Sequence, residues 1–252
     1  MITPTINTKL IQLNPLQAEL KYFLKAVKSD NTAIRENAQE NLVRISRLLV
    51  SYLNQPMPLD GTKESDLLIQ IAKEAPEQTV PVLIDALEGS YNPYIKGNCA
   101  YILGHLGESV ISSQTVLEHA LHDDSSYVRK YAIYGLREVI KAAKENRQVV
   151  NVSIAPKLIK ALRDPNKSVH VLAACAIGHL GGKAVSPAVE DLTKFLGSEN
   201  VSIPPVAAFA LRKIAQEDPN GVSRALHAAR TQLGLNGRKW ADHTIQAVSE
   251  RQ

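Results

Sequence analysis

Residues 153–182, SIAPKLIKALRDPNKSVHVLAACAIGHLGG, decide the fold, because their pattern recurs before and after them. A periodic apolar run ends at Leu162, the chain breaks at residues 164–166, Asp-Pro-Asn, and a second periodic run extends from Val169 to Leu180. Proline is tolerated in the first turn of a helix but not in its interior. The stretch therefore predicts two helices joined by a short turn.

The second helix of this pair has a regular template of core residues. With Val169 as position zero, small or apolar residues stand at plus four, plus five and plus eight, and Gly178 stands at plus nine. These positions form one face of a helix with 3.6 residues per turn. The template recurs from four other zero positions, namely Ile34, Ile95, Val128 and Ile203. Each zero position follows a matching residue of the preceding helix by eight or nine residues: Ala26, Ala86, Ala120, Ala161 and Phe195.

The spacing of the zero positions predicts a repeat protein. Successive zero positions are separated by 61, 33, 41 and 34 residues. Helix pairs of this length cannot bury an apolar face alone, so they stack into a solenoid. Few aromatic residues, 5% of the chain, and many Ala and Leu residues argue against a β-rich fold. We therefore expect an all-α fold, an α-solenoid of about five helix pairs with end caps.

The loops and breaks in the repeat pattern predict the domain organisation of the chain. Residues 54–63, NQPMPLDGTK, form the clearest loop, and a short helix over residues 64–73 accounts for the 61-residue interval. The polar residues 141–148 lengthen one later interval to 41 residues. We expect an irregular leader and then one solenoid domain, as follows: leader 1–15, solenoid 16–252, regular repeats about 77–214 and C-terminal cap 218–250.

Composition limits the compartment and the partners. The net charge of +4 and the pI of about 9.0 permit an acidic partner without requiring one. Cys99 and Cys175 fall in different repeats, so we expect no disulfide and a reducing compartment. No apolar run reaches the ~20 residues of a spanning helix, and residues 1–15 lack the features of a secretory signal. We expect a cytoplasmic protein with no membrane span.

Two sequence features resemble a known repeat family. They are the turn at residues 123–129, DDSSYVR, and the Gly-His-Leu-Gly runs at residues 104–107 and 178–181. The pattern resembles the HEAT repeat, and more narrowly the HEAT-like repeat of phycobilisome lyases, over about residues 20–214. Chains of the related phycocyanobilin lyase E/F type attach, move or remove linear tetrapyrroles on cyanobacterial light-harvesting proteins. The Trp-rich segment of E-type chains is missing here, where Trp240 is the only tryptophan.

The resemblance implies a function class. It implies a protein-binding scaffold that assists phycobiliprotein or bilin assembly or turnover, with a phycobiliprotein subunit or a companion lyase chain as the partner. It implies a bound bilin as the candidate ligand, and we expect no other cofactor. The alternative is a non-catalytic adaptor for another protein, such as an iron-sulfur or cofactor assembly factor. The residues themselves supply no catalytic motif, so an enzymatic role depends on the resemblance to lyases.

The face opposite the core predicts the binding surface. Positions plus three, plus six and plus ten lie between about 240° and 300° around each second helix, away from the core positions. Aromatic and sulfur-containing side chains recur there, and apolar surface of this kind marks binding sites. The alternative is that these residues pack against neighbouring helices. We expect a concave partner-binding face made of Asn98, Tyr101, His105, Tyr131, Tyr134, Glu138, Leu172, Cys175, His179, Phe209 and Lys213.

Other candidate sites have a simpler structural interpretation. Cys175, His179 and His105 could approach a zinc site, but a fourth ligand is missing, so we expect no metal. Residues 178–182 end a helix instead of following a strand, which predicts a C-terminal cap and not a phosphate loop.

The remaining charged residues predict neither acid–base chemistry nor nucleic-acid binding. Asp123, Asp124 and Asp164 stand with Arg129 at inter-helix turns, where we expect capping and pairing across repeats. The predicted face contains few cations, Lys130 and Lys213, whereas a nucleic-acid site needs several.

Overall fold

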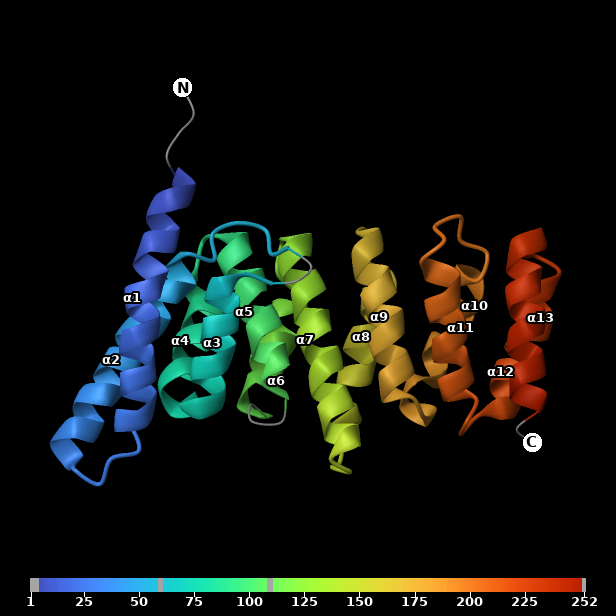
Figure 1. Cartoon of the computed structure of the whole chain (residues 1–252). Helices are drawn as coiled ribbons and strands as arrows, with labels where there is room; N and C mark the ends of the chain where they lie inside the picture. The colour runs from blue at the N-terminus through green and yellow to red at the C-terminus, as the bar shows by residue number, and fades with distance from the viewer. Residues whose placement is uncertain (1–4, 59–60, 108–110, 251–252) are drawn as a thin grey trace. The chain divides into compact units, whose positions relative to one another are not determined.

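The computed structural model describes residues 5–58, 61–107 and 111–250, and the regular elements in these ranges are all helices (Figure 1). The predicted all-α class is confirmed. The chain divides into two compact units, Met1–Val110 and Ile111–Gln252. The expected single domain over residues 16–252 therefore stays a prediction.

Unit 1 is built from five helices. They are α1 Thr5–Ala26, α2 Thr32–Ser51, α3 Lys63–Glu74, α4 Pro76–Gly89 and α5 Pro93–His105. Helix α2 packs against α1, α3 and α4, and α5 packs against α4 and α3. The centre of this unit contains fully buried side chains from three helices: Leu42, Ile45 and Leu49 from α2, Leu68 and Ile71 from α3, and Leu83 from α4.

The N-terminal segment differs from the expected irregular leader. Helix α1 begins at Thr5, and residues 1–4 lie outside the described residues. Leu10, Leu13, Leu16 and Leu20 recur at intervals of three or four, so the helical period continues through Pro15. The predicted short helix is confirmed as α3, which begins with a capping box between Thr62 and Ser65.

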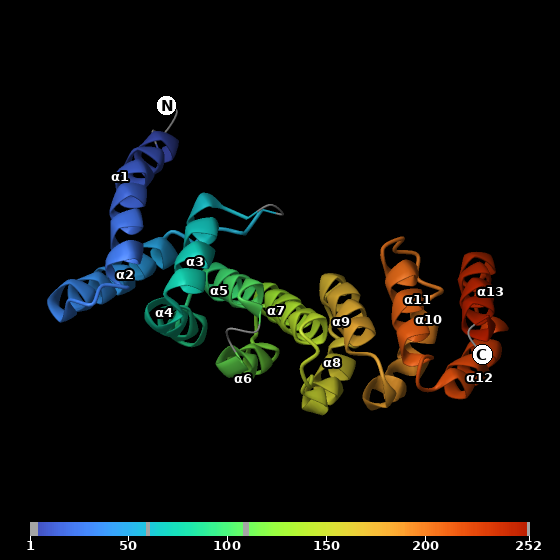
Figure 2. The same ribbon diagram turned by 60° about the horizontal axis from the view of Figure 1, so that its bottom comes forward.

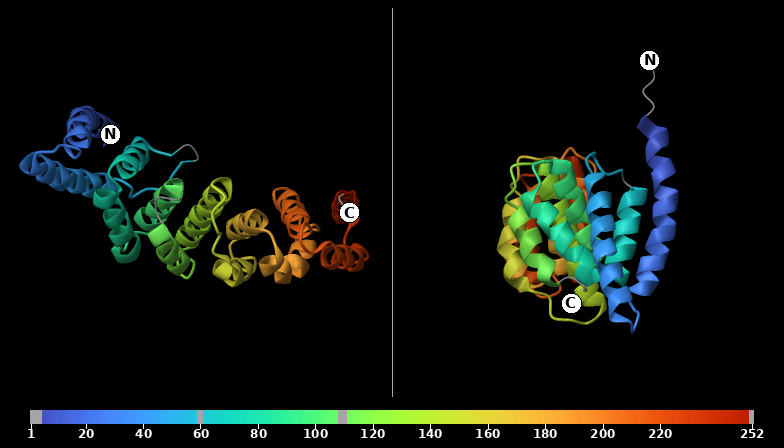
Figure 3. Two further views of the ribbon diagram at one scale, coloured as in Figure 1. Left: turned by 90° about the horizontal axis from the view of Figure 1, so that it is seen from below. Right: turned by 90° about the vertical axis from the view of Figure 1, so that its left-hand side faces the viewer.

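Unit 2 contains four helix pairs. They are α6 Ile111–Ala120 with α7 Ser126–Glu145, α8 Ala155–Ala161 with α9 Lys167–Leu180, α10 Val189–Phe195 with α11 Ile203–Ile214, and α12 Pro219–Arg230 with α13 Leu235–Ser249. Short 3₁₀ turns, Val152–Ile154 and Lys183–Ala188, precede α8 and α10. Within this unit the second helices form one row and the first helices another (Figures 2 and 3). Neighbouring second helices pack against each other along the row, as a solenoid requires.

The core template is confirmed except at its first copies. Val169, Ala173, Ala174 and Ile177 are completely buried, as are the equivalent residues of α7. In α2, Ala38 and Leu42 are buried but Ile34 at the zero position is 43% exposed. Ile34 occupies the same place in α2 as Val169 does in α9, so its exposure depends on the neighbouring helices and not on its position along the helix. The zero position of α5, Ile95, is partly exposed.

The predicted helix ends are also confirmed. Helix α8 ends at Ala161 and α9 begins at Lys167, and the side chain of Asn166 accepts a hydrogen bond from the Ser168 amide at 2.9 Å. Gly181 has a φ of +60° and terminates α9, so glycine is required there.

The polar segment at residues 141–148, which lengthens one repeat interval to 41 residues, begins inside a helix. Helix α7 continues through Lys141 and Lys144 to Glu145, because Lys and Ala are good helix formers. The extra length of this repeat is divided between that extension and the connection that follows it.

Candidate functional site

Asn98 lies in unit 1 at the plus-three position of α5, and it is buried rather than exposed on a binding face. Only 1% of its surface is exposed, and its Nδ2 donates hydrogen bonds to the carbonyl oxygens of Leu53 and Gln55, both at 2.9 Å. These carbonyls belong to the α2–α3 loop. The expected role in partner binding is therefore corrected: the loop covers Asn98, and its amide fixes the loop.

The same loop reaches the next predicted residue of α5. The hydroxyl of Tyr101 lies 4.0 Å from the position that a Cβ on Gly61 would take, and Met57 of the loop is buried. The rings of Tyr101 and His105 meet edge to face with centroids 4.4 Å apart. In unit 1 the chain's own loop therefore lies on the face that we expected a partner to use.

In unit 2 the predicted residues come together on α7, α9 and α11, which pack side by side. Most of them are half-buried or exposed. Tyr131 is the exception, at 8% exposed, because it lies between Tyr127 and Tyr134, with ring centroids 4.7 and 6.4 Å away. We define the second-helix face by the following residues: Lys130, Tyr134, Arg137, Glu138, Lys141, Lys144, Leu172, Cys175, His179, Phe209 and Lys213.

A charged network fixes the α7 part of this face. The guanidinium of Arg137 stacks on the Tyr134 ring, 4.6 Å from its centroid, and its Nε donates to Oε1 of Glu138 at 2.8 Å. Lys141 Nζ donates to the other carboxylate oxygen, Oε2, at 2.9 Å. Burial alone would raise the pKa of Glu138, but the hydrogen bonds from Lys141 and Arg137 outweigh it, so its pKa is lowered. Glu138 is therefore held ionised within its own helix.

Large and small residues interlock between neighbouring second helices. A Cβ added to Gly178 of α9 would lie 2.6 Å from Cδ1 of Phe209 of α11, so the ring packs directly on the glycine. At the equivalent junction between α7 and α9 the sizes are reversed, because the plus-nine residue is the long Arg137 and the plus-six residue is the small Cys175. Residues at plus nine and plus six therefore determine how each pair of repeats fits together.

The electrostatic environment of this face is positive. Burial lowers the pKa of His179, and the neighbouring charges of Arg137 and Lys141 lower it further. The pKa of Lys144 is also lowered, first by burial and then by the charge of Lys213. Lys144 Nζ donates to the terminal carbonyl of α9, Leu180, at 2.6 Å, and a cation is favourable at a helix C-terminus.

Sequence reasoning missed three cations of this face: Arg137, Lys141 and Lys144. The count of only Lys130 and Lys213 was wrong for two reasons. Arg137 stands at plus nine, which was not among the positions taken for the face, and Lys141 and Lys144 lie beyond plus ten, the last of those positions. A periodic signal was present, because residues 130, 134, 137, 141 and 144 recur at alternating intervals of four and three.

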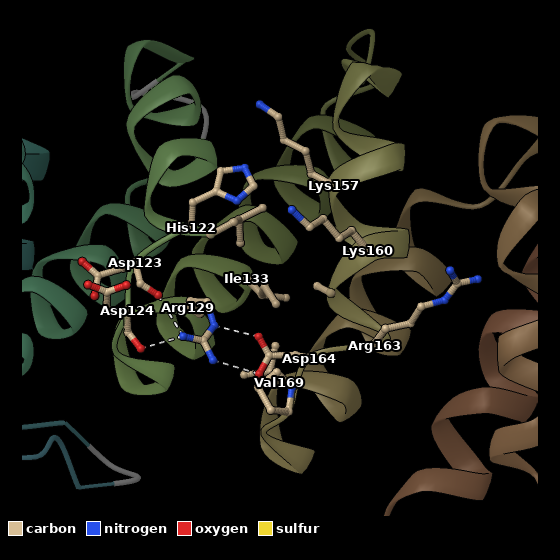
Figure 4. Close-up of a pocket in the computed structure, with 13 residues that line it drawn as sticks. His122, Asp123, Asp124, Arg129, Ile133, Lys157, Lys160, Arg163, Asp164 and Val169 are labelled. Atoms are coloured by element: carbon tan, nitrogen blue, oxygen red, sulfur yellow. Dashed lines mark hydrogen bonds and ion pairs between the residues drawn. The ribbon is translucent and has the colours of Figure 1, made fainter.

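A separate groove of about 480 Å³ lies at the turns between α6 and α7 and between α8 and α9 (Figure 4). Arg129 spans it to Asp164, with Nε–Oδ2 and Nη2–Oδ1 distances of 2.7 and 3.0 Å. Arg129 Nη1 also donates to the carbonyls of Asp123 and Asp124. The predicted pairing across repeats is thus confirmed.

The charges around this groove serve the stacking of repeats. Burial would raise the pKa of Asp164, but the hydrogen bonds from Arg129 and from the Asn166 amide, together with the charge of Arg129, outweigh it and the pKa is lowered. Lys157 pairs with Glu118, and Arg163 pairs with Asp191 at 2.9 Å. Four charged side chains that line the groove, Arg129, Asp164, Lys157 and Arg163, therefore already hold one repeat against another.

The two cysteines are both free. Cys99 is fully buried, and burial raises the pKa of its thiol to about 12. Among the described residues, no group of three or more His, Cys, Asp or Glu side chains is placed to hold a metal ion. Within residues 5–58, 61–107 and 111–250, no helix combines the length and hydrophobicity needed to cross a membrane.

Comparison with solved structures supports the helical-repeat fold. No protein-family model matches this sequence, and no curated protein matches it. Among solved structures, an engineered protein from the Northeast Structural Genomics Consortium is 20% identical with a TM-score of 0.56, covering 92% of this chain and 97% of its own. A designed armadillo repeat protein is 15% identical with a TM-score of 0.55, covering 91% of this chain and 99% of its own. At these identities the likeness concerns the fold alone, and the chain is an all-α helical-repeat solenoid.

Proposed function

We propose that this chain is a protein-binding scaffold and that the second-helix face of unit 2 receives the partner. The observation that carries the proposal is the partly exposed row of Tyr134, Leu172, Cys175 and Phe209 along three packed helices, bordered by Lys and Arg. Protein interfaces combine such an apolar centre with a polar rim, and aromatic and Arg residues dominate their binding energy. Helical-repeat solenoids use extended surfaces of this type for binding.

The internal contacts of the face also favour binding. Tyr134 is fixed by Arg137, and Arg137 is fixed in turn by Glu138. Phe209 is fixed by Gly178. Side chains that are already ordered lose little conformational entropy when a partner arrives, and this loss is one of the main costs of association. The face therefore favours a partner with a complementary surface of its own.

A narrower form of the proposal is assistance to phycobiliprotein or bilin assembly or turnover. It is supported by the resemblance of residues 123–129 and of the two Gly-His-Leu-Gly runs to phycobilisome-lyase repeats. It is also supported by Arg137 and Lys141 beside Tyr134, whose charges would pair with the carboxylates of a bilin. The alternative is a non-catalytic adaptor for another protein, such as an iron-sulfur or cofactor assembly factor.

The test is replacement of Tyr134 by Ala, followed by affinity capture from an extract of the source organism and mass spectrometry. We expect loss of about 1–3 kcal/mol of binding free energy, because aromatic anchors at the centre of an interface carry that much. Tyr91→Ala is the matched control, since Tyr91 is fully exposed in unit 1. If Tyr134→Ala lowers the melting temperature and retains the partner, the residue is part of the core and the face is misplaced.

The wild type and Tyr134→Ala also distinguish a role in bilin or phycobiliprotein assembly from a role as a non-catalytic adaptor. Mixing the wild type with phycocyanobilin should shift the visible absorbance of the pigment, and Tyr134→Ala should reduce the shift. A captured phycobiliprotein subunit would support the same form. Capture of one other protein, lost in Tyr134→Ala and without any pigment shift, would support the adaptor instead.

A further inference from the structure

Helix α7 carries four cations and one tyrosine of the second-helix face in a regular row. Lys130, Tyr134, Arg137, Lys141 and Lys144 follow one another at intervals of four, three, four and three residues, so they lie along one side of the helix. We call them the cationic stripe. Its ends are 14 residues apart, which corresponds to about 21 Å along a helix that rises 1.5 Å per residue.

The charge of the stripe is only partly balanced inside unit 2. Helices α9 and α11 contain no Asp or Glu, and α7 contains Glu138 and Glu145. Glu138 is shared by Arg137 and Lys141, so one carboxylate serves two cations. Lys130 forms no ion pair with a described residue, and its Nζ lies 4.7 Å from the centroid of the Tyr131 ring. Lys144 donates one of its three hydrogens to a backbone carbonyl.

We infer that the cationic stripe binds an acidic helical segment of the partner protein, which would present carboxylates at intervals of three and four residues over about four turns. This inference rests on the proposed function and specifies its partner. Charge complementarity selects an acidic partner. A linear stripe with helical spacing matches the spacing of carboxylates on one side of another helix.

A protein segment fits this surface better than a nucleic acid. Glu138 lies beside Arg137 and Lys141, where it would repel a continuous row of phosphates. The Tyr134 ring has Arg137 stacked upon it, so a base could stack there only by displacing the guanidinium. Separate carboxylates on a helix can instead reach Lys130 at one end of the stripe and Lys144 at the other.

The probe is a fluorescein-labelled, alanine-rich peptide of 20 residues with Glu at alternating intervals of three and four, and its binding to the full chain is followed by fluorescence anisotropy. A second peptide has Gln in place of every Glu. The test variant is Lys130→Gln/Lys141→Gln/Lys144→Gln. The matched control, Lys160→Gln/Lys167→Gln/Lys183→Gln, removes the same charge from exposed positions of unit 2 outside the second-helix face. Circular dichroism and thermal unfolding establish that each variant is folded.

We expect the Glu peptide to bind, the Gln peptide not to bind, and the stripe variant to lose about tenfold in affinity, since three partly exposed ion pairs contribute roughly 0.5 kcal/mol each. The control should change affinity less than about twofold. Because Lys144 caps α9, Lys130→Gln/Lys141→Gln replaces the triple variant if that one unfolds, with a loss of about fivefold expected. Equal losses in the stripe and control variants would overturn the inference, because net charge alone would then explain binding.

Two further outcomes also decide the matter. Tighter binding of a 20-nucleotide oligothymidine than of the Glu peptide would overturn the inference in favour of nucleic acid. A cellular partner that Tyr134→Ala loses but the stripe variant retains would overturn the acidic segment and leave the scaffold function standing. If the stripe variant also loses that partner, both proposals gain support.

Discussion

Helix α5 of unit 1 and helix α7 of unit 2 share a core template but differ on the opposite side. At plus three and plus six, α5 has Asn98 and Tyr101, whereas α7 has Tyr131 and Tyr134. Asn98 holds the α2–α3 loop through two backbone carbonyls, and that loop reaches Tyr101. On α7 the equivalent residues belong to a cluster of rings and cations.

The two helices also differ in charge, since α7 carries more Lys and Arg residues than α5. Lys96 is the only Lys or Arg of α5, whereas α7 carries Arg129, Lys130, Arg137, Lys141 and Lys144. The residues of the core template thus build the same helix pair in both units, while the remaining positions decide what each helix contacts next. In α5 these positions serve the chain's own loop, and in α7 they form a surface suited to a partner.

The largest effect expected is on the loop contact of α5. Asn98→Ala would leave the carbonyls of Leu53 and Gln55 without their side-chain donor, at a cost of about 2–4 kcal/mol in unfolding free energy. Urea denaturation would measure the loss. Asn41→Ala, which removes an exposed hydrogen bond within α2, should cost less than about 0.5 kcal/mol. Equal costs would mean that Asn98 does not fix the loop, and the contrast with α7 would disappear.

The second largest effect on stability is expected at the contact between Gly178 of α9 and Phe209 of α11. Gly178→Ala would push a methyl group into the Phe209 ring and cost about 1–3 kcal/mol, and Phe209→Leu should recover part of the loss in the double variant. Gly89→Ala is the control in unit 1, because nothing lies within 4 Å of the added Cβ. That change should be neutral or stabilise by up to about 1 kcal/mol. Additive costs in the double variant would show that the ring does not pack on the glycine.

Sequence patterns predicted the core because burial repeats with the helical period. Val169 and Ala173 had to be buried if the helix existed, and the Asp-Pro-Asn turn had to lie between two helices. The burial of Asn98 could not be predicted this way, since it depends on a loop that begins 45 residues earlier. A local period contains no information about such a distant contact.

The cations of the candidate site were missed for a different reason. Arg137, Lys141 and Lys144 have the same helical spacing as the core residues, but they fall outside the three positions from which the face was predicted. Lys141 and Lys144 together with Ala142 favour a helix, and the continuous α7 places them beside α9. Which cations share a face was therefore predictable, whereas the stacking of Arg137 on Tyr134 depends on side-chain packing.

The smallest effect expected is a dependence of stability on pH through His179. Burial and the charges of Arg137 and Lys141 lower its pKa in the folded chain, so the unfolded chain takes up a proton at a higher pH than the folded chain does. Stability should therefore fall as the pH drops from 7 through the ordinary His value of about 6.5. The lowered pKa values of Glu138 and Asp164 act only at more acidic pH, because those groups are carboxyls.

Unfolding free energies measured between pH 5 and 7.5 would isolate this contribution. His179→Gln should flatten the decline in that range, whereas His227→Gln, which changes an exposed residue of α12, should leave it as in the wild type. If the second-helix face of unit 2 is positive, the two variants should differ in this way. Burial is the main factor that disfavours the charged imidazole of His179, and the charges of Arg137 and Lys141 come next. If His179→Gln declines as steeply as the wild type, the field at the cationic stripe is too weak to distinguish α7 from α5.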